Sequence, residues 1–233
     1  MPDGRESHPG LDRRVLRRTE ETLASDVSLI ASEFLAGFQL VSQIDRPAVS
    51  IFGSARVRED TPTYESALAV GRIFAERGFA VVTGGGPGVM EAANRGCKEA
   101  GGLSVGFNIE LPQEEGLNGW CDISITFHHF YARKVMFVKA AEGFVIFPGG
   151  FGTQDELWEA LTLIQTGVIE SFPVVLFDSD YWGELLDWLR DETLDDGLIS
   201  PEDLELLHVT HDPHEAVEIV VSGYNARMAE GSA

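Results

Sequence analysis

The fold is decided by the stretch Gly143-Phe-Val-Ile-Phe-Pro-Gly-Gly-Phe-Gly-Thr-Gln-Asp-Glu156. Its first part, residues 143–147, has the Val, Ile and Phe side chains of a buried strand, and its glycines lead into a helical pattern over residues 154–165. A strand that passes through glycines into a helix is the unit of a parallel sheet covered by helices. This segment therefore predicts an α/β fold.

The same alternation extends in both directions from this segment. The other apolar runs are Ala48–Phe52, Phe79–Thr83, Leu103–Asn108, Ile123–Phe127, Pro173–Phe177 and a weaker one at His208–Thr210, and the helical patterns between them include Tyr64–Arg77, Val89–Ala100 and Ala132–Ala141. An amphipathic pattern over residues 20–44 precedes the first strand. We predict a Rossmann-like, doubly wound parallel sheet with an extra N-terminal helix.

The chain divides into a short arm and one domain. Residues 1–18 are rich in Pro, Gly and Arg without apolar periodicity, which predicts a mobile arm. Residues 19–233 form the single Rossmann-like domain, with an N-terminal helix over 19–45, the sheet and its helices over 47–212, and a C-terminal helix over 213–230. We expect the N-terminal helix to pack outside the core or against another subunit.

Composition excludes several classes of protein. The 17 basic and 38 acidic residues give a net charge of −21, which speaks against nucleic acid and anionic membranes as partners. Most of this charge lies in residues 178–233, away from the glycine loops. We find no apolar run near the roughly 18 residues that span a bilayer. With only two cysteines and no signal-peptide core, the chain is expected in the cytoplasm.

Two glycine loops follow predicted strands, Thr83–Glu91 and Pro148–Glu156. In a doubly wound sheet, ligands bind beyond the carboxyl ends of the strands, and glycine N–H groups at a helix start can hold a phosphate. The candidate phosphate and ribose contacts are Gly84, Gly85, Gly86, Gly88, Gly149, Gly150, Gly152 and Thr153. The alternative is that these glycines only make tight turns.

Familiar nucleotide motifs fit these loops poorly. Neither loop has the Lys and Ser or Thr of a P-loop, and the first strand is followed by a single glycine, Gly53, which speaks against NAD. Ser54 after that strand is a candidate ligand contact, and Arg56 is either another or a solvated loop residue.

Charged residues mark the same edge of the sheet. Arg133 and Lys134 open a helix, where cations are disfavoured unless an anion is near, so they bind a ligand or pair with surface acids. Glu156 and Glu91 follow the glycines; either could stabilise an oxocarbenium-like centre or orient water, and the plainer reading of Glu156 is a helix cap. His128 and His129 lack further ligands at helical spacing, so no metal is expected.

These motifs carry a family resemblance. Pro148-Gly-Gly-Phe-Gly-Thr-Gln-Asp-Glu156, with Gly84-Gly-Gly-Pro-Gly-Val-Met90 and Arg133-Lys134 upstream, resembles the LONELY GUY family of phosphoribohydrolases, formerly labelled lysine decarboxylases, over about residues 47–177. The N-terminal helix and residues 108–112 resemble its longer bacterial members.

The resemblance implies a function. Members of this family cleave the N-glycosidic bond of cytokinin riboside 5′-monophosphates, and some act on AMP, as Rossmann-like homodimers without a cofactor. Their catalytic Arg and Glu correspond to Arg133 and Glu156, and their phosphate and ribose contacts to the loops 84–88 and 149–153. A small nucleoside monophosphate is then the expected partner.

Two alternatives stay open. A pyridoxal-phosphate decarboxylase, which the old label suggests, needs a Schiff-base lysine, and among Lys98, Lys134 and Lys139 only Lys134 is placed for it. A nucleotide or cofactor carrier would use the same loops to bind without cutting.

Overall fold

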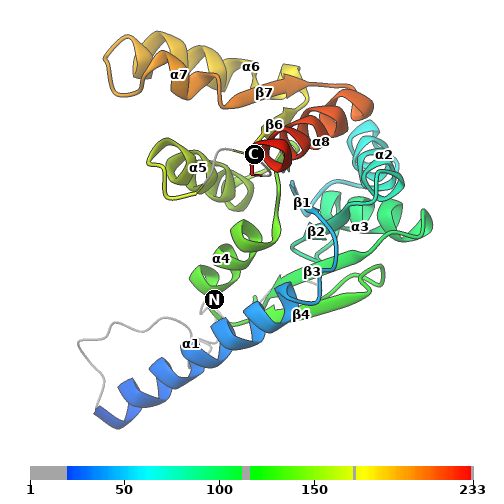
Figure 1. Cartoon of the computed structure of the whole chain (residues 1–233), viewed down its shortest axis with the longest axis vertical. Helices are drawn as coiled ribbons and strands as arrows, with labels where there is room; N and C mark the ends of the chain where they lie inside the picture. Colours follow the sequence, from blue (N-terminus) through cyan, green and yellow to red (C-terminus); the bar gives the residue numbers. More distant parts are fainter. Residues whose placement is uncertain (1–19, 112–115, 170–171, 232–233) are drawn as a thin grey trace, which may run out of the picture.

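The computed structural model describes residues 20–111, 116–169 and 172–231. Within them lies one seven-stranded sheet in the order β4-β3-β2-β1-β5-β6-β7, in which all neighbouring strands are parallel. The strands are β1 (Ala48–Phe52), β2 (Ala80–Thr83), β3 (Ser104–Ile109), β4 (Ile123–Phe127), β5 (Phe144–Ile146), β6 (Val174–Phe177) and β7 (Leu207–Thr210). The prediction of a doubly wound parallel sheet is confirmed (Figure 1).

Helices cover both faces of this sheet because its strands are apolar on both sides. One face packs against α2 (Pro62–Glu76), α3 (Val89–Glu99) and α8 (Pro213–Glu230), and the other against α4 (Phe130–Ala140), α5 (Phe151–Gln165) and α6 (Ser179–Trp188), which is followed by a π-helical turn at Leu189–Leu194 and the short α7 (Pro201–Leu204). Alternate residues of a strand serve opposite faces: Ile51 joins the first core and Phe52 the second.

The strand order places a topological switch point at the middle of the sheet, between β1 and β5. β1 pairs with β2 on one side, where Ser50 is opposite Val82, and with β5 on the other, where Phe52 is opposite Ile146. The chain therefore leaves β1 and β5 toward opposite faces, through α2 and α5. Ligands bind at such a switch point, outside the carboxyl ends of the strands.

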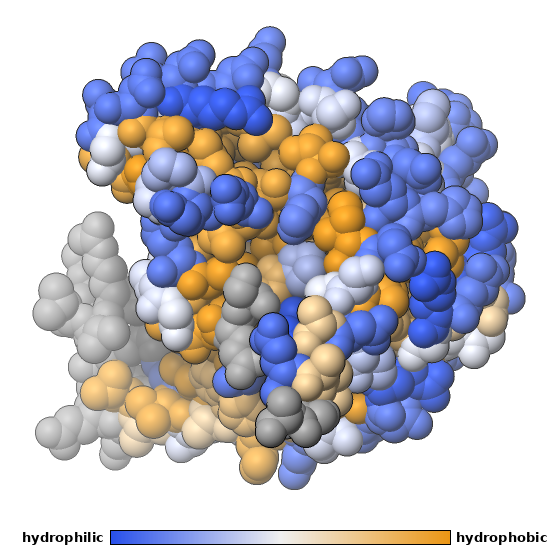
Figure 2. All heavy atoms as spheres, turned by 45° about the horizontal axis from the view of Figure 1, so that its top comes forward, coloured by the Kyte–Doolittle hydropathy of each residue, from blue (hydrophilic) through white to orange (hydrophobic). Residues whose placement is uncertain are grey.

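The N-terminal helix α1 (Glu20–Val41) lies against α4 and β4, and its C-terminal half contributes Leu40, with Phe34 and Val41 beside it, to the core on that face of the sheet (Figure 1). Much of its apolar surface is exposed, and Figure 2 shows hydrophobic atoms at the lower left, where α1 lies. The large exposed side chains of this helix are Leu23, Val27, Leu29, Leu35 and Phe38.

This helix bears on one expectation from the sequence. The segment Leu23–Val41 has 19 residues and, by length and composition alone, is apolar enough to cross a membrane. No uninterrupted apolar run of that length occurs in it, because polar residues such as Asp26, Ser32 and Glu33 divide it. The segment qualifies only on its average hydropathy, which is weak evidence for a membrane span.

Three helices start earlier than the apolar patterns indicated. α2 begins at Pro62, α4 at Phe130 and α5 at Phe151, two or three residues before the expected starts. In α4 and α5 the first residues include the exposed aromatics Phe130, Tyr131 and Phe151, which lie outside the buried apolar stripe that periodicity detects. As a result Gly152 and Thr153 lie in the first turn of α5, and Glu91 lies in the first turn of α3 and not in the loop before it. The arm 1–18 lies outside the described residues.

Candidate active site

Three helix starts lie beyond the carboxyl ends of the strands: α3 after Gly88, α4 after His129 and α5 after Gly150. At these three positions no side chain caps the first turn in the described structure, so each start keeps backbone N–H groups without a side-chain acceptor. Such groups and the positive end of the helix dipole attract anions. The site is therefore built to receive negative charge.

Ser54, half-buried after β1, joins the two glycine loops. Its backbone N–H donates to the carbonyl of Pro148 at 3.0 Å, and its carbonyl accepts from the N–H of Val89 at 3.2 Å. Its side-chain oxygen accepts from the N–H of Arg56 at 3.1 Å, which shapes the turn, and Arg56 is exposed. Ser54 thus connects the start of α3 to the loop that precedes α5.

The first glycine loop is packed tightly into the chain. Gly85 and Gly88 have φ of 68° and 69°, a region that L-residues avoid. A Cβ on Gly88 would overlap the carbonyl of Ser54, and one on Gly86 would lie 2.8 Å from Met90. Gly85 and Gly88 are therefore required by the fold itself, whereas Gly86 meets only the flexible end of the Met90 side chain.

A buried polar network that the sequence analysis missed supports this loop. Asn94 of α3 is fully buried, and its Oδ1 accepts from Thr83 at 2.5 Å and from Asn118 at 3.1 Å. Asn118 also donates its N–H to Gly85 O at 2.7 Å and its Nδ2 to Gly86 O at 2.9 Å. These bonds hold the two loop carbonyls toward Asn118. One sign of this network is present in the sequence, the polar residue Asn94 within the helix predicted over residues 89–100.

The second glycine loop is open. Among the described residues, nothing lies within 4 Å of a Cβ built on Gly150 or Gly152, and neither glycine has a positive φ. Phe151 between them is 92% exposed. Gly149 is held from behind, by Thr153 packed against it and by the Tyr181 hydroxyl, which donates to its carbonyl at 2.7 Å. Within the described part of the chain, the Cβ positions of Gly150 and Gly152 therefore face open space.

Glu156 lies one turn and a half into α5 and is 5% exposed. Burial raises the pKa of its carboxyl to about 7, against the charges of Arg133 and Lys134, which lower it. As the sixth residue of the helix it is too far along to cap the first turn, so the cap interpretation does not fit. A buried carboxyl poised near neutral pH beside a cation is typical of catalytic sites.

Arg133 links the first glycine loop to Glu156. Its Nε donates to Phe107 O at 2.7 Å, and its guanidinium carbon lies 5.1 Å from the centre of the Phe137 ring. The other end of the guanidinium lies against Gly84. Arg133 is therefore half-buried and oriented before any ligand arrives.

Lys134 is paired within the chain. Its ammonium lies 2.9 Å from Asp155 and 3.3 Å from Glu159, and these carboxylates, with Glu156, raise its pKa against the effect of burial. A Schiff-base lysine must lose its proton, so Lys134 does not fit the role that pyridoxal phosphate would require. The partners of Lys134 are therefore Asp155 and Glu159, which both lie on α5.

The adjacent histidines are occupied with carboxylates. His128 and His129 both contact Glu33 of α1, and His128 also contacts Glu110. In the part of the chain that the structure describes, no group of three or more His, Cys, Asp or Glu side chains is arranged to hold a metal ion. Glu91, the other candidate acid, is half-buried in the first turn of α3.

Comparisons with known proteins add an independent line of evidence. The family described as possible lysine decarboxylase matches residues 90–220. The chain is 34% identical to the cytokinin riboside 5′-monophosphate phosphoribohydrolase of Mycobacterium tuberculosis, over 66% of this chain and 82% of the relative. It is 27% identical to the Rhodococcoides fascians protein of the same name, over 75% and 89%.

Solved structures share the fold. The molybdenum cofactor carrier protein from Chlamydomonas reinhardtii is similar with a TM-score of 0.55 and 27% identity, over 76% of this chain and 97% of that one. The molybdenum cofactor binding protein from Rippkaea orientalis matches with a TM-score of 0.56 at 24% identity, over 77% and 98%, which shows the fold alone.

Proposed function

Because the chain belongs to the LONELY GUY family, which carries the older description of possible lysine decarboxylase, we propose that it is a nucleoside 5′-monophosphate phosphoribohydrolase. It cleaves the N-glycosidic bond of a cytokinin or purine riboside 5′-monophosphate and releases the free base and ribose 5-phosphate. The observation that carries this proposal is Glu156, a buried carboxyl with a pKa of about 7 next to Arg133 and behind an unfilled glycine loop.

Each group of residues at the site has a role that follows from its position relative to the nucleotide. The second loop, with Gly149, Gly150, Gly152 and Thr153, receives the 5′-phosphate on the N–H groups at the start of α5. The first loop, with Gly84, Gly85, Gly86 and Gly88, lines the ribose together with Ser54 and Glu91. Arg133 anchors the nucleotide, and Lys134 holds α4 to α5 through its two carboxylates.

The reaction is a hydrolysis at C1′. The C1′–N bond breaks, its electron pair leaves with the base, and the ribose ring gains positive charge that the Glu156 carboxylate stabilises. A water oxygen bonds to C1′ and gives up a proton, and the departing base takes one up, so the products balance as base plus ribose 5-phosphate. Glu156 must be ionised to act in this way.

The test is release of free base from AMP and from isopentenyladenosine monophosphate by the purified chain. Glu156→Gln keeps the shape of the side chain and removes its charge, and we expect it to release little base. Glu65→Gln makes the same change at an exposed position of α2, on the opposite face of the sheet from α5, and serves as the control. Equal release by the wild type and Glu156→Gln would reject the mechanism.

A nucleotide or cofactor carrier is the second candidate. The similarity to the Chlamydomonas carrier protein favours it, because the same loops would hold the phosphate of a cofactor. A carrier has no need of a buried acid that titrates near neutral pH. Tight AMP binding in calorimetry, with no base after prolonged incubation, would favour the carrier.

We further propose that the protein acts as a homodimer in the cytoplasm, independent of cofactor, nucleic acid and membrane. The exposed apolar side chains of α1, with Phe130 and Tyr131 of α4, supply a surface of the kind that subunits bury. Light scattering at micromolar concentration should give twice the chain mass of 25.5 kDa. A monomeric mass would reject the dimer and leave the reaction untested.

A further inference from the structure

Helix α4, which carries Arg133, begins without an anion of its own. Its first turn contains no acidic residue, and its N-cap residue His129 makes no side-chain cap bond. Two cations, Arg133 and Lys134, follow at its fourth and fifth positions. The positive end of the helix dipole and these charges disfavour this start unless a negative charge lies close to it.

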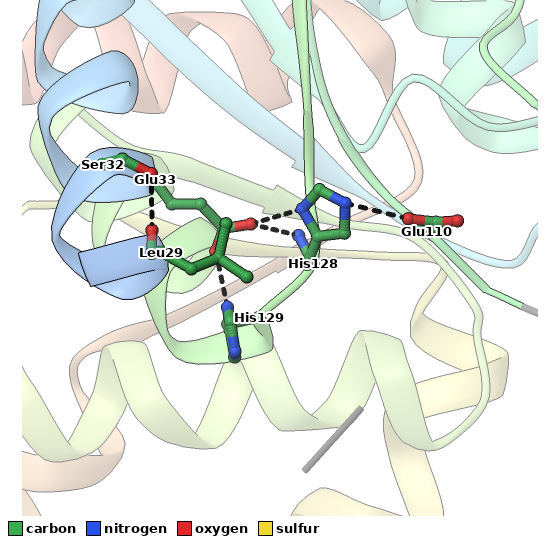
Figure 3. A network of polar contacts seen from close by, with 6 residues as sticks. All are labelled: Leu29, Ser32, Glu33, Glu110, His128 and His129. Carbon is green, nitrogen blue, oxygen red and sulfur yellow. Dashed lines mark hydrogen bonds and ion pairs between the residues drawn. The ribbon is translucent and has the colours of Figure 1, made fainter. Parts of the chain in front are cut away.

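Glu33 of α1 supplies that charge from 95 residues away in the sequence. Its Oε1 accepts from the backbone N–H of His128 at 2.6 Å and lies 2.7 Å from His128 Nδ1, and its Oε2 lies 2.8 Å from His129 Nδ1 (Figure 3). On the far side of the ring, His128 Nε2 lies 3.0 Å from Glu110. One carboxylate therefore holds both residues that precede α4.

The sequence of α1 makes this carboxylate unusual. Glu33 is the only acid in residues 27–41, and it is 7% exposed in a helix that leaves many of its apolar side chains in solvent. Burial raises the pKa of Glu33, but the bonds from His128 and His129 outweigh it and hold the pKa below its ordinary value. The side chain is thus a fixed anion at neutral pH. Burying an ion is costly unless it is well paired, as here.

We propose that Glu33 is a positioning residue for the phosphoribohydrolase site: it fixes the start of α4 and thereby the guanidinium of Arg133. The inference rests on the proposed function. The path is short, because the N–H of Arg133 bonds to His129 O at 3.3 Å in the first turn. From there the guanidinium lies against Gly84 and bears on Glu156. The N-terminal helix is then a working part of the site.

A purely structural role for Glu33 makes a different prediction. In that case Glu33→Gln would lower the melting temperature, and the molecules that stay folded would keep the wild-type kcat/KM and Glu156 pKa. If Glu33 positions Arg133, the variant displaces the guanidinium, and the positive charge that holds down the Glu156 pKa moves away. The acid limb of kcat/KM then shifts to higher pH. The other groups facing Glu156 are Lys134, Asp155 and Glu159, and Glu33 touches none of them.

The experiment compares Glu33→Gln with Glu110→Gln in the full chain. Both changes remove one charge next to His128, but the Glu110 side chain is 61% exposed and contacts only the far ring nitrogen. We expect Glu33→Gln to lower kcat/KM about 10- to 100-fold, as small displacements of catalytic groups do, and to move the acid limb upward. Glu110→Gln should change neither.

A second readout does not depend on activity. The ¹³C shift of the Glu156 carboxyl reports its own titration, separately from His128 and His129, in the wild type and both variants. A higher Glu156 pKa in Glu33→Gln supports the inference; an unchanged pKa with only a lower melting temperature overturns it. If the wild type releases no base, the proposed function fails, and the carboxyl titration still decides whether Glu33 positions Arg133.

Discussion

The two glycine loops have the same layout, strand to glycines to helix, yet their glycines are needed for different reasons. In the first, Gly85 and Gly88 have positive φ, and added side chains on the loop would overlap neighbouring atoms of the chain. In the second, Gly150 and Gly152 have ordinary backbone angles and open space in front of them. The chain itself requires Gly85 and Gly88 of the first loop. In the second loop only Gly149, which packs against Thr153, is crowded, and nothing in the described residues requires Gly150 or Gly152.

This difference distinguishes the glycines that folding requires from the glycines that are available for ligand binding. A glycine in the first turn of a helix lowers its stability relative to alanine, and Gly152 occupies such a position in α5. When a fold carries this cost with no steric reason of its own, a ligand that approaches the backbone closely is the natural explanation. The first loop builds the site, and the second loop is where we expect the phosphate.

The largest expected effect is that of Glu156→Gln on the rate. Loss of a buried charge aimed at the developing cation should lower kcat by about 10³-fold, as for other preorganised electrostatic groups. Quantified base release from AMP measures it. A loss of less than tenfold would mean that Glu156 is not the catalytic carboxylate. It would also contradict the assignment of different roles to the two loops.

The same substitution should stabilise the protein. Burial raises the Glu156 pKa from 4.5 to about 7, so the folded chain keeps a proton that the unfolded chain has released between these pH values. The free energy of unfolding therefore falls as pH rises from about 4.5 to about 7. The amide avoids this cost, and at pH 8 urea denaturation should show a gain on the order of 2 kcal/mol. No gain would mean that the carboxylate is fully compensated by Arg133.

Gly88→Ala tests the first loop. The positive φ and the overlap with Ser54 O should together lower the free energy of unfolding by about 3 kcal/mol. Chemical denaturation measures this change, and Gly78→Ala, which has positive φ but open space, separates strain from overlap. Equal losses in both variants would show that only the backbone angle matters.

Gly152→Ala tests the second loop in the opposite sense. The melting temperature should stay the same or rise slightly, since Ala is the better helix former. A methyl group in the phosphate path should lower kcat/KM about 10- to 30-fold, mainly through KM, by analogy with other lost binding contacts. An unchanged KM with unchanged stability would remove the second loop from the site.

The smallest effect is that of pH on the wild type. The ionised form of Glu156 is the active one, so kcat/KM should reach half its maximum near pH 7 and fall about tenfold for each unit below. A rate profile from pH 5.5 to 8.5 measures it. A limb near pH 4.5 would mean that Arg133 and Lys134 offset the effect of burial and leave the Glu156 pKa unshifted in the free enzyme.

Several features could be predicted from local sequence. The seven apolar runs coincide with the seven strands to within a residue or two, because strands buried on both faces need continuous Val, Ile and Phe. The glycine loops and Glu156 could be predicted because clustered glycines after an apolar strand, and an acid that follows them, are easily recognised in the sequence. The starts of α4 and α5 were predicted less well, because their first turns hold the exposed aromatics Phe130, Tyr131 and Phe151, which do not continue the buried apolar stripe.

Other features depend on neighbours that are remote in the sequence. The sequence left Lys134 either as a ligand contact or as a partner of surface acids, and only the packing of α4 on α5 pairs it with Asp155 and Glu159. No role was assigned to Glu33 from the sequence, and only the docking of α1 brings it to the histidines.

The sequence by itself determined the doubly wound sheet, its two glycine loops and the residues that mark its edge. These follow from short-range physics: apolar runs pair as strands, and glycines allow the turns between them. Only the tertiary structure decided which glycines are crowded and which face open space, and which charges meet. Steric overlap and electrostatic pairing act over a few ångströms, and the groups concerned are tens of residues apart along the chain.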